Sequence, residues 1–382
     1  MSSQKKSESA RAFAEDGACK THVGGQALIE GVMMRGKYNW AVAVREPSGE
    51  IYIEEHDLAS GKKKNGWLYW PFVRGCRAFV ESLMLGFQAL EIAALHAYGE
   101  EAEETEEAAK ADEAEVKTAA VDEVEAGAAN AGETEGGAAK AESKAAKADE
   151  EDMVEFGHKE MVFSMVMGLV LGVVLFVVAP ALITNLIVGE YDENTLLWNI
   201  VDGVIRVGVF VFYIWLIGRM EEIRRMFSYH GAEHKTIHCF EHGLPLTVEN
   251  ARTFPCLHVR CGTAFLIMVM LIAILVYTVV PLDKLILALG VPDGAIKLVL
   301  VILVRIALMP VIAGISYEIT VKWAGNHPEN PLVKVILWPG MQMQRLTTKE
   351  PDDDMLECAI ASMKAVLARE DAENAKESAP AA

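Results

Sequence analysis

The chain has 382 residues, which is long enough for two or three domains. Hydrophobic residues make up 52% of it and its mean hydropathy is +0.21, yet it carries 54 acidic residues and a net charge of −19. These values agree only if apolar and acidic residues occupy different segments. No basic surface pattern or RNA-binding motif occurs, so no nucleic-acid partner is expected.

The acidic residues are concentrated between Glu100 and Asp152, where 19 acids and 5 lysines stand in an Ala-rich sequence of low complexity. Such a composition cannot bury enough apolar surface to order a chain. Residues 100–152 are therefore predicted to be a disordered acidic insert or a fraying solvated helix. The polar residues 1–21, which lack the apolar core of a signal peptide, and the tail 370–382 are also predicted to be disordered.

Residues 22–60 predict a small β-rich domain. An alternating run over Trp40–Arg45 and a short run at Ile51–Ile53 flank the turn sequence Pro47–Gly49, which is the pattern of a hairpin. The preceding GGQALIEGVMMRG, residues 24–36, has glycines without the spacing of a dinucleotide or phosphate loop. Backbone turns with positive φ are the expected reason for these glycines.

Residues 61–99 predict an interfacial amphipathic helix region. Lys62–Lys64 precede aromatic residues up to Trp70, a combination that an anionic headgroup layer selects, although a solvated loop with buried rings has the same composition. The run from Pro71 to Tyr98 is apolar and helical in period but holds charged side chains. It predicts an interfacial or bundle-packing helix rather than a membrane span.

Four apolar runs beyond the insert predict a mainly α integral membrane protein. They are Met161–Ala179, continuing past Pro180 to Val188, and Leu197–Ile217 within residues 153–217, and Thr263–Val280 and Ala295–Ile315 within residues 263–316. Asp202 and Arg206 lie four residues apart on the second span, where they can pair. Arg305, near the middle of the fourth span, would cost about 3 kcal/mol as a lone cation. It is expected to face protein, either in an ion pair or lining a polar site.

The loop between the second and third spans, residues 218–262, carries six lysines and arginines, whereas the connector after the first span carries none. The positive-inside rule places this loop and both termini in the cytoplasm of a multi-pass cell-membrane protein. Residues 317–369 are then cytoplasmic as well, with an amphipathic helix predicted from Asp352 to Arg369. Cysteines on this side are expected to be reduced thiols.

The same loop, residues 218–262, concentrates the candidate chemistry. His230, Glu233 and His234 form the pattern H-x-x-E-H, which on a helix brings both imidazoles to one face with the carboxylate beside them. A zinc ion held in this way lowers the pKa of a bound water towards about 7, and Glu233 as general base can take the proton. The predicted third ligand is His258, and the predicted hydrogen-bond partners or alternative ligands are His238, Glu241, Arg260 and Cys261.

Thiolate and imidazole donors favour zinc over magnesium, so the predicted cofactor is a divalent transition metal. Three other interpretations stay open. The histidines can form an interfacial polar cluster in which Lys235 and Arg260 contact lipid headgroups. They can form a transport or sensing site, or one of them can activate a cysteine nucleophile.

Several stretches together resemble one family. They are GGQALIEGVMMRG (24–36), WAVAVR (40–45), PFVRG (71–75), ESLMLG (81–86), YHGAEHKTIHCFE (229–241), FPCLHVRCGT (254–263), SYE (316–318) and PGMQMQRLTTKEPDDDMLECAI (339–360). The chain thereby resembles the YqhQ-like family of bacterial membrane proteins of unknown function, which are labelled predicted metal-dependent enzymes. The resemblance implies the membrane location and the order of segments. Where the family reads His-Pro-Arg-Cys-Gly-Thr, this chain has valine between His258 and Arg260.

The resulting expectation is a metal-dependent hydrolase at the cytoplasmic membrane face, which would suit a lipid or membrane-peptide substrate. The alternative is a membrane scaffold, transport component or metal sensor without catalytic activity. A third option is that residues 22–60 dock a cytoplasmic partner. Membrane lipids are the partners that the sequence indicates.

Overall fold

The computed structural model describes residues 23–58, 70, 73–121, 163, 166–189, 195–280, 285–286, 288–291, 295–324, 327 and 330–378. Of the acidic insert predicted over residues 100–152, residues 100–121 continue the helix Val73–Val121, whereas residues 122–152 lie outside the described ranges, as do residues 1–21 and 62–64. The chain divides into two compact units, residues 100–183 and the rest of the chain. The sheet, the candidate site and most of the membrane helices belong to the larger unit, residues 1–99 and 184–382.

The predicted small β-rich domain is confirmed as a four-stranded antiparallel meander with strand order β1-β2-β3-β4. The strands are β1 (Gly24–Leu28), β2 (Gly31–Arg35), β3 (Asn39–Arg45) and β4 (Ile51–Asp57). The predicted turn between β3 and β4 contains Gly49 with a φ of +87°, a conformation that favours glycine.

The glycines of residues 24–36 do not have positive φ, so the explanation expected for them is wrong. A Cβ at Gly25 would lie 2.8 Å from side-chain carbons of Glu233, and one at Gly31 would lie 2.4 Å from the carbonyl oxygen of Ala43. A Cβ at Gly36 would equally overlap a helix side chain, Val366 Cγ1, at 2.4 Å. These glycines allow close approach by neighbouring elements.

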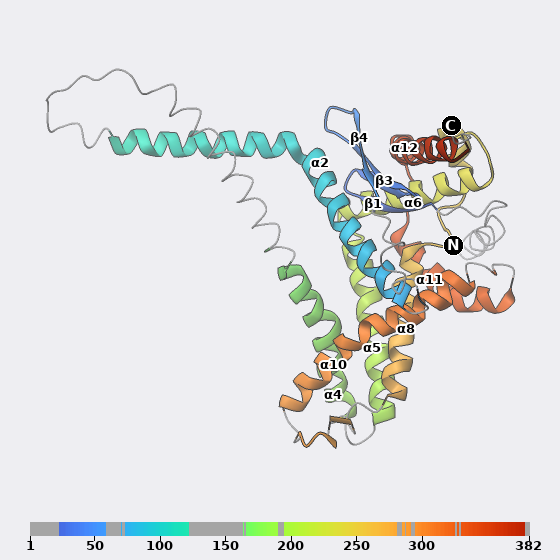
Figure 1. The fold of residues 1–382 in the computed structure, drawn as a ribbon. Helices are drawn as coiled ribbons and strands as arrows, with labels where there is room; N and C mark the ends of the chain where they lie inside the picture. Colours follow the sequence, from blue (N-terminus) through green and yellow to red (C-terminus); the bar gives the residue numbers. More distant parts are fainter. Residues whose placement is uncertain are drawn as a thin grey trace. The chain divides into compact units, whose positions relative to one another are not determined.

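Helices cover both faces of the sheet (Figure 1). Successive residues of a strand point to opposite faces, so Met33 and Val42 pack against α2 (Val73–Val121), whereas Val32 and Met34 pack against α6 (Glu221–Glu241) and α12 (Asp353–Ser378). Each of these fully buried side chains contributes about 1.5–3 kcal/mol. Burial on both faces explains why β3 is apolar over nearly its whole length.

The remaining helices include the membrane-crossing part. In chain order they are a π-helical turn η2 (Val174–Val178), α4 (Ala179–Val188), α5 (Thr195–Ile217), α7 (Val248–Arg252), α8 (Gly262–Val279), α10 (Ala295–Tyr317), a second π-helical turn η3 (Glu318–Trp323) and α11 (Pro331–Thr347). The helix predicted from Asp352 to Arg369 is α12, which continues to Ser378 into the segment predicted as a disordered tail.

Four helices within the described residues are long and apolar enough to cross a membrane, and they indicate a multi-pass membrane protein. They are Val73–Tyr98, Val166–Val188, Leu196–Ile217 and Val299–Thr320. The last three coincide with predicted spans. The other predicted span lies in α8, of which Ile267–Tyr277 is found as a shorter apolar helix.

Residues 73–98 of α2 meet the length and composition of a span, but their packing favours the predicted bundle-packing helix. Leu85, Ala89 and Ala93, spaced four residues apart, lie against the sheet. Near the start of α2, the guanidinium of Arg74 pairs with the carboxylate of Glu318, just beyond α10. One face of this segment is thus covered by the sheet rather than by lipid.

The charges inside the spans face protein, as predicted for Arg305. Asp202 accepts hydrogen bonds from Arg206 on the same helix at 2.9 Å and from Arg305 on α10 at 3.5 Å. Arg305 also donates to the side-chain oxygen of Asn199 at 3.1 Å, and its guanidinium lies 5.0 Å from the ring centroid of Tyr277. The pairing offsets part of the desolvation cost of each charge.

Candidate metal site

Helix α6 supplies most of the candidate residues. It begins with Glu221 and Glu222, whose charges suit the positive end of the helix dipole, and its second half lies buried between the sheet and the surrounding loops. The four-residue spacing places His230, His234 and His238 in successive turns of one face. The helix predicted for H-x-x-E-H is therefore confirmed.

A loop from Thr253 to Cys261 returns along this face of α6 and is anchored to it by Lys235. The ammonium group of Lys235 donates to the backbone carbonyls of Arg252 at 3.0 Å and Phe254 at 2.7 Å. It also pairs with Glu350 at 2.7 Å, and the side chain is only 3% exposed. Lys235 thus fixes the loop that carries Cys261 and is not a headgroup contact.

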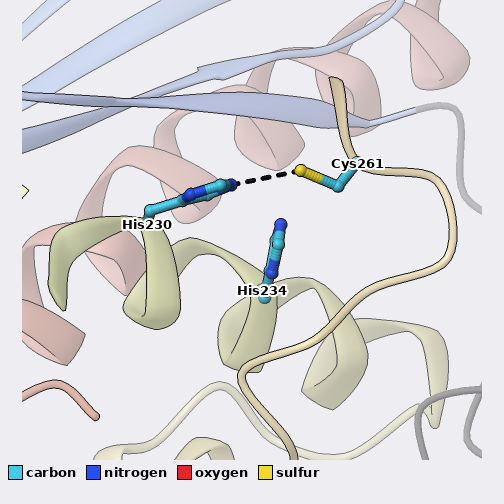
Figure 2. Close-up of side chains that lie close together, drawn as sticks. All are labelled: His230, His234 and Cys261. Atoms are coloured by element: carbon cyan, nitrogen blue, oxygen red, sulfur yellow. Dashed lines mark hydrogen bonds between the residues drawn. The ribbon is translucent and has the colours of Figure 1, made fainter. Parts of the chain in front are cut away.

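The structure brings His230, His234 and Cys261 together. Their ligand atoms, two imidazole nitrogens and Sγ, all lie within 4.8 Å of one another. Figure 2 shows the two rings rising from neighbouring turns of α6 towards the thiol, which comes from the loop opposite. His230 Nε2 lies 3.2 Å from Cys261 Sγ.

Both imidazoles are oriented by backbone carbonyls. Nδ1 of His230 donates to the carbonyl of Thr347 at 2.9 Å, and Nδ1 of His234 donates to the carbonyl of Cys256. A carbonyl only accepts, so each Nδ1 carries a proton and each Nε2 faces the cluster. Nε2 of His234 is buried and has no hydrogen-bond partner among the described residues. This arrangement is the usual one for a histidine that ligates a metal.

The environment favours a thiolate at Cys261. Burial raises the pKa of this thiol, but the charges of His230 and His234 outweigh that effect and hold the pKa well below its ordinary value. Cys261 also stands directly before α8, whose N-terminal dipole favours a negative charge. Burial lowers the pKa of His230, but the thiolate more than compensates and raises it to about 9. Without a metal the two form an imidazolium–thiolate pair.

A second group consists of His238, Glu241 and His258, and it lies beside the first, with the ring centroids of His234 and His258 5.7 Å apart. Nε2 of His258 donates to Glu241 at 3.4 Å, while its Nδ1 accepts from the backbone N–H of Arg260 at 3.3 Å. Glu241 also pairs with the guanidinium of Arg260. Both ring nitrogens of His258 are thus engaged by protein.

Burial dominates the electrostatics of this second group. It lowers the pKa of His238 to about 3, with a smaller contribution from His258, and it also lowers the pKa of His258 well below the ordinary value. Both imidazoles are therefore neutral. The second group is a satisfied hydrogen-bond network next to the Nε2 atoms of the first group.

Glu233 points away from the second group towards strand β1. The carboxylate lies next to the backbone of Gly25, which favours its charged form. Burial raises the pKa of Glu233, although the neighbouring charges of His230 and His234 oppose this rise. The side chain is 5% exposed. It lies close enough to the cluster to respond to the charge on both imidazoles.

The structure therefore joins His230 and His234, as predicted, with Cys261, which the sequence offered only as an alternative ligand. The predicted third ligand, His258, lies in the second group instead. Sequence reasoning did not single out Thr347 or Gln344. The side chain of Gln344 accepts from the backbone N–H of His258 at 3.0 Å and donates to its carbonyl at 2.8 Å. Nothing in the local pattern of these two residues points to histidines about a hundred positions earlier.

Comparison with known proteins agrees with the sequence motifs. The model of the family "Protein of unknown function (DUF1385)" matches residues 70–369. The chain belongs to this family. The uncharacterized protein YqhQ of Bacillus subtilis (strain 168) is 29% identical over 344 residues, which cover 90% of this chain and 92% of that protein. The YqhQ-like resemblance is thereby confirmed. No solved structure matches the chain.

Proposed function

We propose that His230, His234 and Cys261 bind a divalent transition metal, zinc in the first instance, and that the protein is a metal-dependent hydrolase at a membrane surface. One observation carries the proposal. Two imidazoles that are each fixed through Nδ1 to a backbone carbonyl turn their Nε2 atoms towards the sulfur of Cys261. Two nitrogens and a sulfur suit zinc, iron or copper better than magnesium or calcium.

The donor set leaves room for chemistry as well as binding. Zinc sites that catalyse reactions have three protein ligands, and the ion then acts as a Lewis acid that lowers the pKa of a coordinated water to about 7. Glu233 holds or accepts a proton near the two imidazoles because burial raises its pKa. The network of Glu241, Arg260 and His258 keeps the loop before Cys261 in place.

A second candidate function rests on the same thiol. The imidazolium–thiolate pair of His230 and Cys261 is also the arrangement of an activated cysteine nucleophile. The convergence of a second imidazole, His234, on the same sulfur favours metal binding over this interpretation, since a nucleophile needs one histidine and not two. A scaffold or metal sensor would use the same ligands without an open position.

The membrane context supports a substrate in or near the bilayer. Cys261 directly precedes α8, so the cluster stands at the end of an apolar helix. The lysines and arginines of residues 218–262 support a cytoplasmic location of the site and of both termini in the cell membrane. A lipid or a membrane-embedded peptide fits this position.

The deciding experiment is elemental analysis of detergent-purified protein. We expect about one zinc per chain, lost in a His230→Ala/His234→Ala variant and weakened in Cys261→Ser. The matched control is His327→Ala, because His327 is an exposed histidine outside both groups. Equal metal content in all four proteins would refute the site. Glu233→Gln is expected to keep the metal and to lose hydrolytic activity, and retained activity would remove the assignment of Glu233 as the base.

A further inference from the structure

The first half of α11 exposes apolar side chains along one side. Leu332 is 55% exposed, Val335 69% and Trp338 60%. The opposite side is buried, where Val333 and Leu337 pack in a cluster with the loop that leads to Cys261. Both sides of this half are therefore apolar, but only the buried side packs against protein in the described part of the chain.

The connections of α11 place the exposed side next to the membrane spans. The helix follows the end of α10 after the π-helical turn η3, and it begins at Pro331 with Asn330 capping the N–H of Leu332 at 2.9 Å. Ile336, in the middle of its first half, packs against a cluster formed by α8 and α10. In Figure 1, α11 runs across the upper end of α8 rather than along it. It does not itself qualify as a span.

The other half of α11 reaches the candidate site. Its side chain Gln344 holds the backbone N–H and the carbonyl of His258, and the carbonyl of Thr347 accepts from Nδ1 of His230. The same 17-residue helix thus carries exposed apolar residues at one end and two anchors of the site at the other.

We propose that the first half of α11 lies in the headgroup layer of the bilayer, with Leu332, Val335 and Trp338 in contact with lipid, and that this contact holds the segment around His258 and Cys261 in place. Lipid is the fitting occupant because Ile336 of the same half packs on the cluster of α8 and α10, and α10 lies in a segment that is apolar and long enough to span, with exposed side chains such as Leu303. Tryptophan prefers this depth in a bilayer.

Lipid contact is tested by tryptophan quenching in the full chain reconstituted into phosphatidylcholine vesicles whose acyl chains are brominated near the headgroup or near the chain end. The chain has seven tryptophans, so the contribution of Trp338 is the difference between the wild type and Trp338→Phe. We expect this contribution to be quenched more strongly by the shallow bromine, whereas the contribution removed by the control Trp40→Phe, a ring buried against the sheet, is not quenched. Stronger quenching of Trp338 by the deep bromine would show a spanning helix and overturn the proposal. Absence of quenching at Trp338 would show a protein partner, such as a second copy, and would overturn it too.

The coupling to the site is tested by hydrogen exchange, a readout that needs neither metal nor activity. Val335→Asp changes an exposed residue and should not prevent folding, yet it weakens contact with the apolar layer. We expect faster amide exchange over residues 256–261 in vesicles, relative to the matched exposed change Leu244→Asp outside α11. Unchanged exchange over residues 256–261 would overturn the coupling. Because the proposal is independent of catalysis, a failed metal measurement would leave it standing.

Discussion

The contact between Gly25 and Glu233 allows a sharp test of how β1 and α6 fit together. In Gly25→Ala the new Cβ would lie 2.8 Å from Cγ and Cδ of Glu233, well inside van der Waals contact. Glu233 is buried, so making room for the Cβ has to move its side chain within the core or displace α6 from the strand. Overpacking of this kind costs about 1–3 kcal/mol.

The neighbouring Gly24 is the matched control, because a Cβ there has nothing within 4 Å. Both changes reduce the freedom of the unfolded chain alike, so the difference between them isolates the overlap. We expect Gly25→Ala to lower the free energy of unfolding, measured by denaturant titration in detergent, by about 1–3 kcal/mol more than Gly24→Ala. In a Glu233→Ala background the difference should nearly vanish. Equal costs for the two glycines, or a cost undiminished without the Glu233 side chain, would refute the close approach.

Three further outcomes are expected. In chelator-treated protein, the His230–Cys261 pair stabilises the fold while the imidazole is protonated. Because the pKa of His230 is raised to about 9, this contribution is present at lower pH and is lost as the pH rises through about 9. The advantage of the wild type over Cys261→Ser in thermal unfolding should therefore shrink above that pH. Lys235→Met removes the donor to two backbone carbonyls and should cost roughly 1–3 kcal/mol, whereas a neutral effect would show that the loop is held by other contacts. Asp202→Asn leaves two arginines near one neutral partner, so it should lower detergent stability more than Arg305→Met does, and the reverse order would contradict the shared pairing.

The parts of the fold that depend on local periodicity could be predicted from the sequence. The alternation over residues 40–45 gave a strand, the apolar runs gave three of the helices that are long enough to span, and H-x-x-E-H gave two imidazoles on one face of α6. In each case the deciding information lies within a few turns or a few strand positions, where backbone geometry alone fixes which side chains are neighbours.

The choice between Cys261 and His258 could not be made in this way. Both stand on one irregular loop, and which of them reaches His230 depends on the anchoring of that loop by Lys235 and by Gln344 of a distant helix. No helix was predicted over α11, which contains Pro339 in its interior and remains one continuous helix in its tertiary context. The glycines of β1 and β2 were misread for the same reason, since their role depends on partners far along the chain.

The position of the hairpin turn at Glu30 has a consequence for biogenesis. Its carboxylate binds the guanidinium of Arg225 and the hydroxyl of Tyr229, and the sheet behind it also packs against α12 at the other end of the chain. Apolar membrane-crossing helices stand between the sheet and α6 and again between α6 and α12. These pieces can meet only if every intervening helix has been inserted with the right orientation. A chain with one inverted span would therefore separate the sheet or α12 from α6, which carries His230 and His234.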